Sequence, residues 1–356
     1  MDSSYHPSTP HSPSLVLQLE HISRSYTLGS GSKKSTRTIL HDINLAIKQG
    51  EVLCLVGPNG AGKTTTVKIC GTLLTPDSGD VRIAGIDAVH DPREARSHVS
   101  LLLGGESGFY RNVSALDNLR YFADLADVPY RERDTRIIQA LGRVGLTDKA
   151  KERVQTFSRG MWQRLHIARS LIAHTELLLL DEPTTGLDPE NARNVRSLIQ
   201  DLRNDGTAIL LTTHEMSEAE KLADSVAVIN RGRIIARGNV QELSAHQHID
   251  HVSVYAYDSE VLPRDAVERL ELISSVRWCE ASQSHGVWNI TIAWSISEEE
   301  STRVELPVEG VRLLGHRRAS LEETYLSILH NAHSNTHESD DQADHSTHEE
   351  DAHDIA

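Results

Sequence analysis

Directly after the apolar run Val52–Val56, the chain reads Gly57-Pro58-Asn59-Gly60-Ala61-Gly62-Lys63-Thr64-Thr65. This stretch matches the P-loop pattern G-x-x-x-x-G-K-[ST]. Glycines at these spacings let the backbone curl so that successive N–H groups converge on phosphate oxygens, and the helix that follows presents its positive end. The strand before the loop and the helix after it favour a phosphate site over a Gly-rich turn that binds nothing. The sequence therefore predicts an α/β fold organised around a phosphate-binding loop.

A second group of side chains supplies the carboxylates that such a loop needs for hydrolysis. Lys63 would reach the outer phosphates of a nucleotide, and the Thr64 hydroxyl would ligate Mg²⁺. Hydrolysis also needs a carboxylate in the metal shell and a group that orients water. Four leucines over residues 177–180 lead into Asp181 and Glu182. Alone, this pattern also fits a strand that meets a surface loop, but beside the P-loop it predicts Asp181 for the metal and Glu182 for water.

Composition limits the function classes. The 356 residues carry a net charge of −15, which argues against nonspecific binding to nucleic acid. About half of that charge comes from residues 331–356, which hold eight acidic residues and no Lys or Arg. Cys54, Cys70 and Cys279 lie far apart in the sequence, as expected of a reduced cytosolic protein. Because no run approaches the roughly 18 apolar residues that span a bilayer, any role at a membrane is expected to be at its surface.

The chain is expected to contain two ordered domains between flexible ends. Residues 1–14 are rich in Ser, Pro and His and are predicted to be disordered, as is the acidic, His-dotted tail 331–356. Antiparallel strands and an α/β core are predicted over residues 15–245, with a helical insertion at about 106–173. Residues 246–330 are predicted to form a small α+β accessory domain.

Residues 15–245 resemble the ATP-binding subunit of an ABC transporter. The two motifs above match the family's Walker A and Walker B motifs, and the signature motif is matched by Phe157-Ser158-Arg159-Gly160-Met161. Ser158 is suited to cap a helix whose free N–H groups can bind an anion. By resemblance, that anion is the γ-phosphate of ATP on a second copy of the chain, so Ser158 and Gly160 would act in trans in a head-to-tail pair. Taken alone, the motif would mean only an ordinary capped helix.

Three further stretches match the family. Gly186-Leu187-Asp188 resembles the D-loop that helps to join two cassettes. His214 follows an apolar strand, as the family's switch histidine does, and would contact the γ-phosphate; by itself it would be a polar surface residue. Tyr26 resembles the aromatic residue that stacks on adenine, a contact worth about 1 kcal/mol, although an edge-strand tyrosine would look the same.

One element departs from the family pattern. The family has a Gln before the helical insertion, whereas this chain has Leu103-Gly104-Gly105-Glu106-Ser107-Gly108-Phe109-Tyr110. Glu106 is the nearest side chain able to ligate Mg²⁺, and we expect it to substitute for the Gln. This Gly-Gly-Glu form resembles cassettes of ABC-2 type drug and antibiotic exporters.

The resemblance implies a function and a set of partners. Two copies would bind ATP and Mg²⁺, hydrolyse ATP and power export through a separate transmembrane permease, from the cytoplasmic, inner face of the cell membrane. No nucleic-acid partner is expected. One alternative is a soluble ABC ATPase of translation or DNA maintenance, which usually has two cassettes or a long coiled coil. Another is a non-catalytic nucleotide sensor, which the presence of Lys63, Asp181 and Glu182 disfavours.

Overall fold

The computed structural model describes residues 14–28, 34–103, 108–173, 175–257, 261–284 and 286–329. The chain divides into two compact units, residues 1–234 and 235–356. Glu106 and nearly all of the two predicted disordered ends lie outside the described ranges. Within those ranges, none of the helices is both long enough and apolar enough to cross a membrane.

A six-stranded sheet carries the P-loop at the end of one of its central strands. In spatial order its strands are β10 (Arg233–Gly238), β9 (Ser225–Asn230), β3 (Val52–Val56), β8 (Ala208–Thr213), β7 (Leu177–Asp181) and β6 (Val99–Leu102). β3 pairs in parallel with β8 and β9, and β7 pairs in parallel with β8 and β6. The carboxyl ends of β3, β8 and β7 therefore meet at one edge of the sheet.

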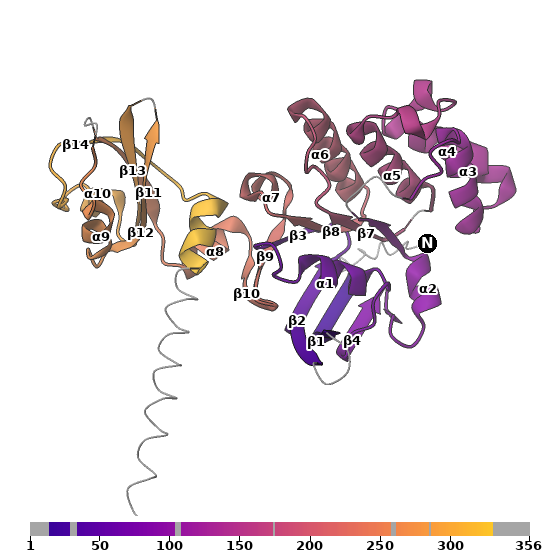
Figure 1. Cartoon of the computed structure of the whole chain (residues 1–356), viewed down its shortest axis with the longest axis horizontal. Coiled ribbons are helices and arrows are strands. Elements are labelled where there is room, and N and C mark those ends of the chain that lie inside the picture. Colours follow the sequence, from indigo (N-terminus) through magenta and orange to yellow (C-terminus); the bar gives the residue numbers. More distant parts are fainter. Residues whose placement is uncertain are drawn as a thin grey trace, which may run out of the picture. The chain divides into compact units, whose positions relative to one another are not determined.

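Helices cover both faces of this sheet. Figure 1 shows α6 (Pro189–Asn204) and α7 (Met216–Leu222) on one face and α1 (Lys63–Cys70) on the other. Every residue of β3 and β7 is buried. Because both faces of these strands are covered, they appear in the sequence as unbroken apolar runs.

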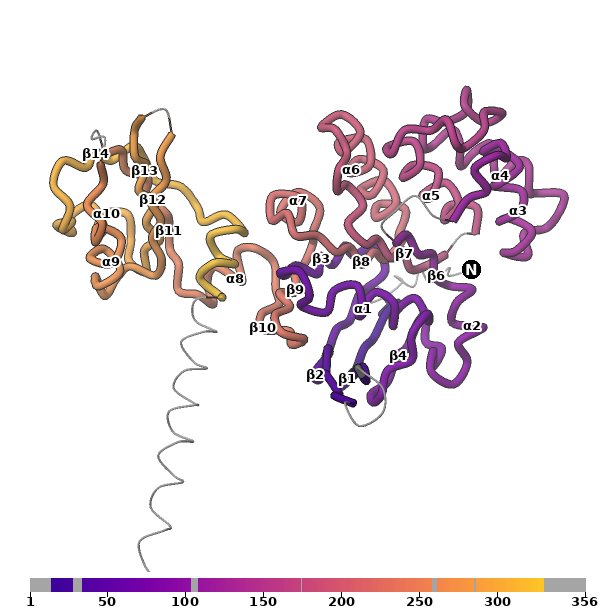
Figure 2. The backbone as a smooth tube through the Cα atoms, viewed as in Figure 1, coloured from indigo at the N-terminus to yellow at the C-terminus, as the bar shows by residue number. Residues whose placement is uncertain are grey.

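An antiparallel sheet packs on the side of α1. Its strand order is β2 (Ser35–Lys48), β1 (Leu15–Leu28), β4 (Ser78–Ile83) and β5 (Ile86–Asp87). Apolar side chains of this sheet, such as Leu17 and Ile43, share one core with Val67 of α1 and Leu179 of β7. The tube in Figure 2 follows β1, β2 and β4 beside α1. The predicted combination of antiparallel strands with an α/β core is confirmed.

The remaining helices of the first unit follow β5 and precede β7. They are α2 (Pro92–Ser97), α3 (Ala115–Leu125), α4 (Tyr130–Arg143) and α5 (Arg159–Ala173), with short 3-10 turns at Thr147–Lys149 and Val154–Thr156. Ser114 caps α3 by accepting a hydrogen bond from the N–H of Asp117. The buried Asn118 amide donates to the carbonyls of Tyr110 and Ser114, which ties the start of α3 to the chain before it.

The second unit has the predicted α+β character. Its elements are α8 (Val240–His246), β11 (His251–Tyr257), α9 (Ala266–Glu271), β12 (Val276–Ser284), β13 (Val287–Trp294), α10 (Glu298–Ser301), β14 (Val311–Arg317) and a helical segment at 321–329. The sheet order is β12-β13-β11-β14, and each strand is antiparallel to its neighbours. Its core includes the fully buried Trp294 together with Ile292 and Leu270.

Close approach of two backbones explains the first glycine of the P-loop. A Cβ atom built on Gly57 would lie 2.2 Å from the carbonyl oxygen of Ile229 in the neighbouring strand β9. Side chains are excluded at such a distance, and the opposing atom belongs to a backbone that cannot move aside. Gly57 therefore lets β3 turn into the loop directly against β9.

We predict that Gly57→Ala destabilises the chain by about 3 kcal/mol, because overpacking against fixed backbone costs up to this much. Gly142→Ala is the matched control: in α4, its added Cβ would meet only the Thr147 hydroxyl oxygen, at 3.9 Å. That substitution should stabilise the chain by up to about 1 kcal/mol, because alanine favours a helix. Thermal unfolding of the two variants measures both effects, and equal melting temperatures would contradict the prediction.

Candidate active site

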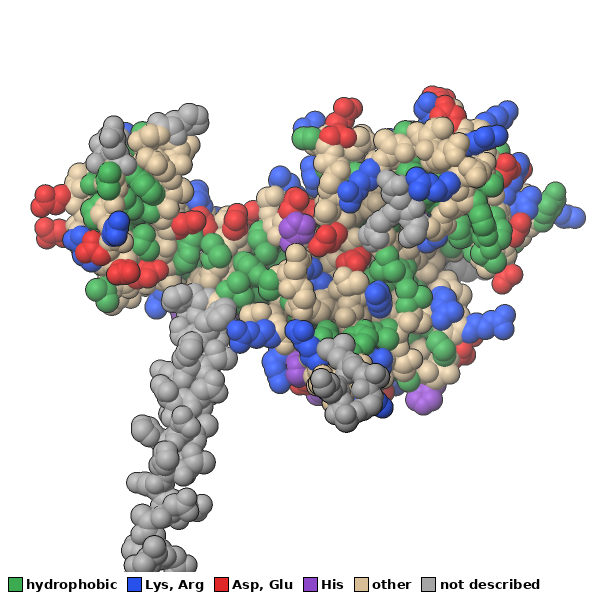
Figure 3. Space-filling view, in the orientation of Figure 1, with side chains coloured by type: hydrophobic (Ala, Val, Ile, Leu, Met, Phe, Trp, Pro, Cys, Tyr) green, Lys and Arg blue, Asp and Glu red, His purple; other side chains and the backbone are tan. Residues whose placement is uncertain are grey.

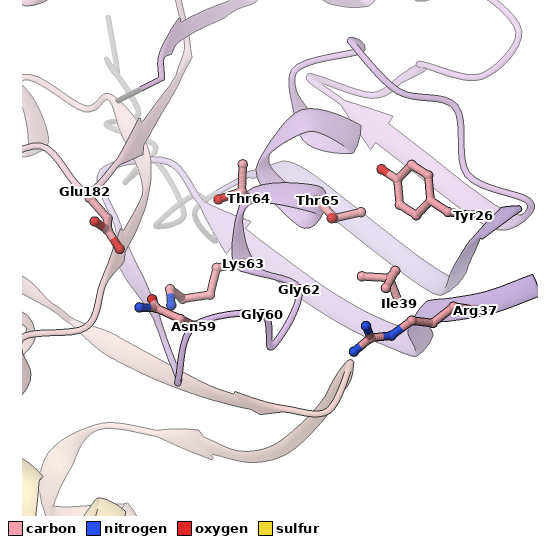
Figure 4. Close-up of a pocket in the computed structure, with 10 residues that line it drawn as sticks. All are labelled: Tyr26, Arg37, Ile39, Asn59, Gly60, Gly62, Lys63, Thr64, Thr65 and Glu182. Atoms are coloured by element: carbon pink, nitrogen blue, oxygen red, sulfur yellow. The ribbon is translucent and has the colours of Figure 1, made fainter. Parts of the chain in front are cut away.

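A cavity of about 420 Å³ lies where the P-loop leaves β3. This volume is within the usual range for sites that bind small molecules. Figure 4 shows the residues that line it: Tyr26, Arg37, Ile39, Asn59, Gly60, Gly62, Lys63, Thr64, Thr65 and Glu182. The structure thus brings Tyr26, the P-loop and Glu182 to one cavity from three separate parts of the sequence.

The Lys63 ammonium is buried in the loop that carries it. Its Nζ donates to the carbonyl oxygens of Gly57 at 2.7 Å and Pro58 at 3.2 Å. Burial lowers the pKa of Lys63, while the nearby Glu182 and Asp181 carboxylates act in the opposite direction. The positive charge is therefore held inside the loop, at the position where phosphate charge would accumulate.

Asp181 forms the link between the P-loop helix and the central sheet. Its buried carboxylate accepts from the Thr64 hydroxyl at 3.1 Å and from the Thr212 hydroxyl at 2.5 Å. The parallel register that places Asp181 opposite Thr212 creates this arrangement. Thr212 was not among the predicted site residues, because a threonine within a buried strand has no local signature.

The donor set at Thr64 and Asp181 suits Mg²⁺. Among the described residues, no group of three or more His, Cys, Asp or Glu side chains could hold a metal by itself. Mg²⁺ does not need such a group: in nucleotide sites it takes one or two carboxylates, water molecules and substrate phosphates. One hydroxyl and one carboxylate 3.1 Å apart supply the protein's share of such a shell. Glu106, the other predicted metal ligand, lies outside the described residues.

Glu182 has a strained backbone and a positioned side chain. Its φ of 51° is in the left-handed region, which non-glycine residues rarely adopt. Its N–H donates to the Thr212 carbonyl at 3.1 Å, and Thr185 Oγ1 donates to its Oε2 at 3.3 Å. Its Oε1 lies 3.2 Å from Nδ1 of His214. Strain of this kind persists where the surroundings over-determine a conformation, as they do at many active sites.

A buried carboxyl group supports the segment that follows Glu182. Thr184 donates its hydroxyl proton to Glu218 of α7, and both side chains are buried. Burial raises the pKa of Glu218 above its ordinary value, against the opposing hydrogen bonds from Thr184 and Thr213. Glu218 was not among the predicted site residues, because in the sequence it is one of several acidic residues in a helix.

The signature motif packs against the D-loop of the same chain. Ser158 Oγ accepts from the N–H of Met161 at 3.3 Å, as a helix cap does. A Cβ atom on Gly186, whose φ is +73°, would lie 2.3 Å from the Arg159 guanidinium, so this glycine lets the guanidinium lie against the loop. Ser158 and Gly160, which both lie in the described ranges, are not among the residues that line the cavity at the P-loop.

Tyr26 stands at the other end of the cavity. Its side chain is 37% exposed, which leaves a ring face accessible. The Arg24 guanidinium carbon lies 5.3 Å from the ring centroid, within the range of a cation–π contact. The ring can therefore offer a flat surface to a base, at the end of the cavity that Lys63 does not occupy.

Comparison with known proteins identifies the family. A model of the family described as "ABC transporter" matches residues 40–185. The ABC transporter ATP-binding protein NatA of Bacillus subtilis (strain 168) is 39% identical over 211 residues, which are 59% of this chain and 86% of NatA. The chain belongs to the ABC transporter family. The resemblance predicted from the motifs is confirmed, and the protein is an ATP-binding and ATP-hydrolysing subunit of the ABC type.

Two further members of the ABC family extend the likeness. The daunorubicin resistance ATP-binding protein DrrA2 of Streptomyces coeruleorubidus is 33% identical over 299 residues, 83% of this chain and 92% of DrrA2. Among solved structures, the dimeric bacterial ABC transporter cassette MJ0796 matches with a TM-score of 0.57 and 25% identity, covering 63% of this chain and 98% of MJ0796.

We predict that Glu182→Gly gives a more stable chain than Glu182→Ala, by about 1 kcal/mol. Glycine relieves the left-handed backbone strain that alanine retains. The same pair of substitutions at Glu220, an exposed residue inside helix α7, is the control and should reverse the order, because alanine favours a helix interior over glycine. Thermal unfolding of the four variants measures this, and an alanine variant at 182 as stable as the glycine variant would refute it.

Proposed function

We propose that this chain is the Mg²⁺-dependent ATPase subunit of an ABC exporter, working as a pair of copies with a separate transmembrane permease. The observation that carries the proposal is that the motif residues of this chain fall into two separate groups. Lys63, Asp181 and Glu182 gather at the carboxyl edge of the sheet, beside the cavity described above. Ser158 and Gly160 are not among the residues that line this cavity. One chain therefore offers half of each of two composite sites.

The cavity residues and the side chains bonded to them support a simple hydrolytic step. A water molecule attacks the γ-phosphorus of ATP, and the bond to the β–γ bridging oxygen breaks, giving ADP and phosphate. Glu182 is suited to accept a proton from that water, and His214 lies close enough to orient the Glu182 carboxylate. Lys63 would stabilise the charge on the outer phosphates, and Thr64 and Asp181 would hold Mg²⁺, which offsets charge on the β- and γ-phosphates.

The trans half of the site would come from a second copy. Ser158 caps the fifteen-residue helix α5, whose first N–H groups suit a phosphate. At Gly160, a Cβ atom would lie 2.6 Å from Asn191 Cγ, so this glycine lets the start of α5 pack closely against α6. The dimeric form of the related cassette MJ0796 supports the same arrangement here.

A groove of about 690 Å³ in the first unit supports a permease partner. It lies between α2 and β6 on one side and α3 and α5 on the other, with Leu73 and Leu125 exposed by 55% and 63%. In Figure 3, hydrophobic side chains gather over the region of α3. Arg169 stands in the groove with its guanidinium 4.8 Å from the Phe122 ring and bonded to the Leu101 carbonyl at 3.0 Å. A cytoplasmic segment of the permease is the partner that we assign to this groove.

The remaining expectations form part of the same proposal. Docking to a permease would hold the chain at the cytoplasmic, inner face of the cell membrane. The drug-resistance names of relatives such as DrrA2 favour export. Three expectations stay predictions. They are the domain boundaries 15–245 and 246–330, the role of Glu106 as a substitute for Gln, and the stacking of adenine on Tyr26.

We predict that Glu182→Gln abolishes ATP hydrolysis and preserves ATP binding and ATP-dependent pairing. The amide keeps the size of the side chain but cannot accept the proton. Phosphate release and size-exclusion chromatography with ATP measure the two properties. Glu215→Gln, an exposed neighbour outside the cavity, should retain hydrolysis. Robust turnover by Glu182→Gln would refute the proposed mechanism.

We also predict that Leu73→Asp combined with Leu125→Asp prevents the permease from co-purifying with the tagged chain. A carboxylate on each side of the groove would be desolvated by a docked apolar segment, which is costly. ATP-dependent pairing of the purified chain should be unchanged. Leu272→Asp, at a site 83% exposed in the second unit, is the control. Full recovery of the permease with the double variant would argue against this groove.

A further inference from the structure

Arg37 lines the nucleotide cavity and has no role in the site described so far. It lies on β2, directly opposite Tyr26 of β1 in the antiparallel register. Residues directly opposite in such a pair direct their side chains to the same face, with Cβ atoms about 5 Å apart. The sheet therefore presents Tyr26 and Arg37 to the same cavity.

Two arginines flank Tyr26, and their charges are used differently. Arg24 donates to the Asp77 carboxylate at 2.6 Å and to the Thr75 carbonyl at 3.1 Å, so its charge is already paired. Arg37 is exposed and makes no hydrogen bond or ion pair with any residue in the described ranges. Of these two arginines, Arg37 is the one whose N–H donors are not used by any residue in the described ranges.

The position of Arg37 indicates which part of a nucleotide it can meet. In Figure 4 its side chain extends from β2 toward the Gly60–Gly62 side of the P-loop, away from the Tyr26 ring. Lys63 lies farther along the same loop, among the residues expected to contact the outer phosphates. A nucleotide with its base on Tyr26 and its outer phosphates at Lys63 would carry its α-phosphate past Arg37.

We propose that Arg37 binds the α-phosphate of the nucleotide. This inference rests on the proposed function, because it assumes that the cavity takes ATP. Among the described residues that line the cavity, Lys63 and Arg37 are the two cations, against the single carboxylate of Glu182. Lys63 and the proposed Mg²⁺ would offset charge on the outer phosphates, which leaves the α-phosphate without a cation. A guanidinium offers several donors in a planar fork that matches phosphate oxygens, and it stays charged at any physiological pH.

The test compares nucleotide affinities of the full chain and its Arg37→Gln variant. Titration with a fluorescent ADP analogue, with ATP, ADP, AMP and adenosine as competitors, gives four dissociation constants for each protein. We expect Arg37→Gln to bind ATP, ADP and AMP about five- to tenfold more weakly and adenosine unchanged, since a partly exposed charge-assisted contact is lost. Arg37→Lys should recover part of the loss, because it keeps the charge without the planar fork.

Several outcomes would overturn the assignment. Unchanged affinities would remove Arg37 from the site. An equal loss for adenosine would assign Arg37 to the base or ribose, and a loss confined to ATP and ADP would assign it to the outer phosphates. Arg82→Gln is the matched control, because Arg82 is exposed on β4 of the same sheet, outside the cavity. If the unmodified chain itself fails to bind ATP, the proposed function fails; if it binds and Arg37→Gln binds equally well, only this inference fails.

Discussion

The nucleotide site depends on the hydrogen bonds that hold one buried carboxylate. Asp181 accepts from Thr64 at the start of α1 and from Thr212 near the end of β8. Burying a carboxylate is costly unless such partners are present. These partners can meet only if β3, β8 and β7 pair in parallel and in the observed register. The packing of the central sheet and the assembly of the groups that we propose for Mg²⁺ thus depend on the same strand register.

Close contacts and strain are concentrated beside this carboxylate. Gly57 leaves no room for a side chain against β9, and Gly186 leaves none against Arg159. Glu182, which lines the same cavity as the P-loop, has a left-handed backbone. Loops confined in this way present their N–H groups and carboxylates at set positions, so little ordering remains to be done when a nucleotide binds. The contact between Arg159 and Gly186 also joins the signature helix to the loop that follows Glu182.

Burial on both faces decided which strands could be recognised from the sequence. Val52–Val56 was predicted with its observed limits, and the leucines at 177–180 were recognised as a strand, because covered parallel strands are unbroken apolar runs. β6 (Val99–Leu102) was not predicted: it is a four-residue edge strand, and three of its residues are only half-buried. β14 (Val311–Arg317) was missed for a related reason, since most of its side chains are exposed and show no alternation.

The sequence by itself determined the class of fold, the P-loop, the Asp181-Glu182 pair and the family, because each depends on residue types at short, constant spacings. Only the tertiary structure decided which distant groups complete the site. Thr212 and Glu218 reach it through strand register and helix packing, and Arg37 through pairing with the strand of Tyr26. None of these three residues belongs to a motif that assigned it to the site. A contact across many residues depends on how strands and helices pack, which local residue patterns do not record.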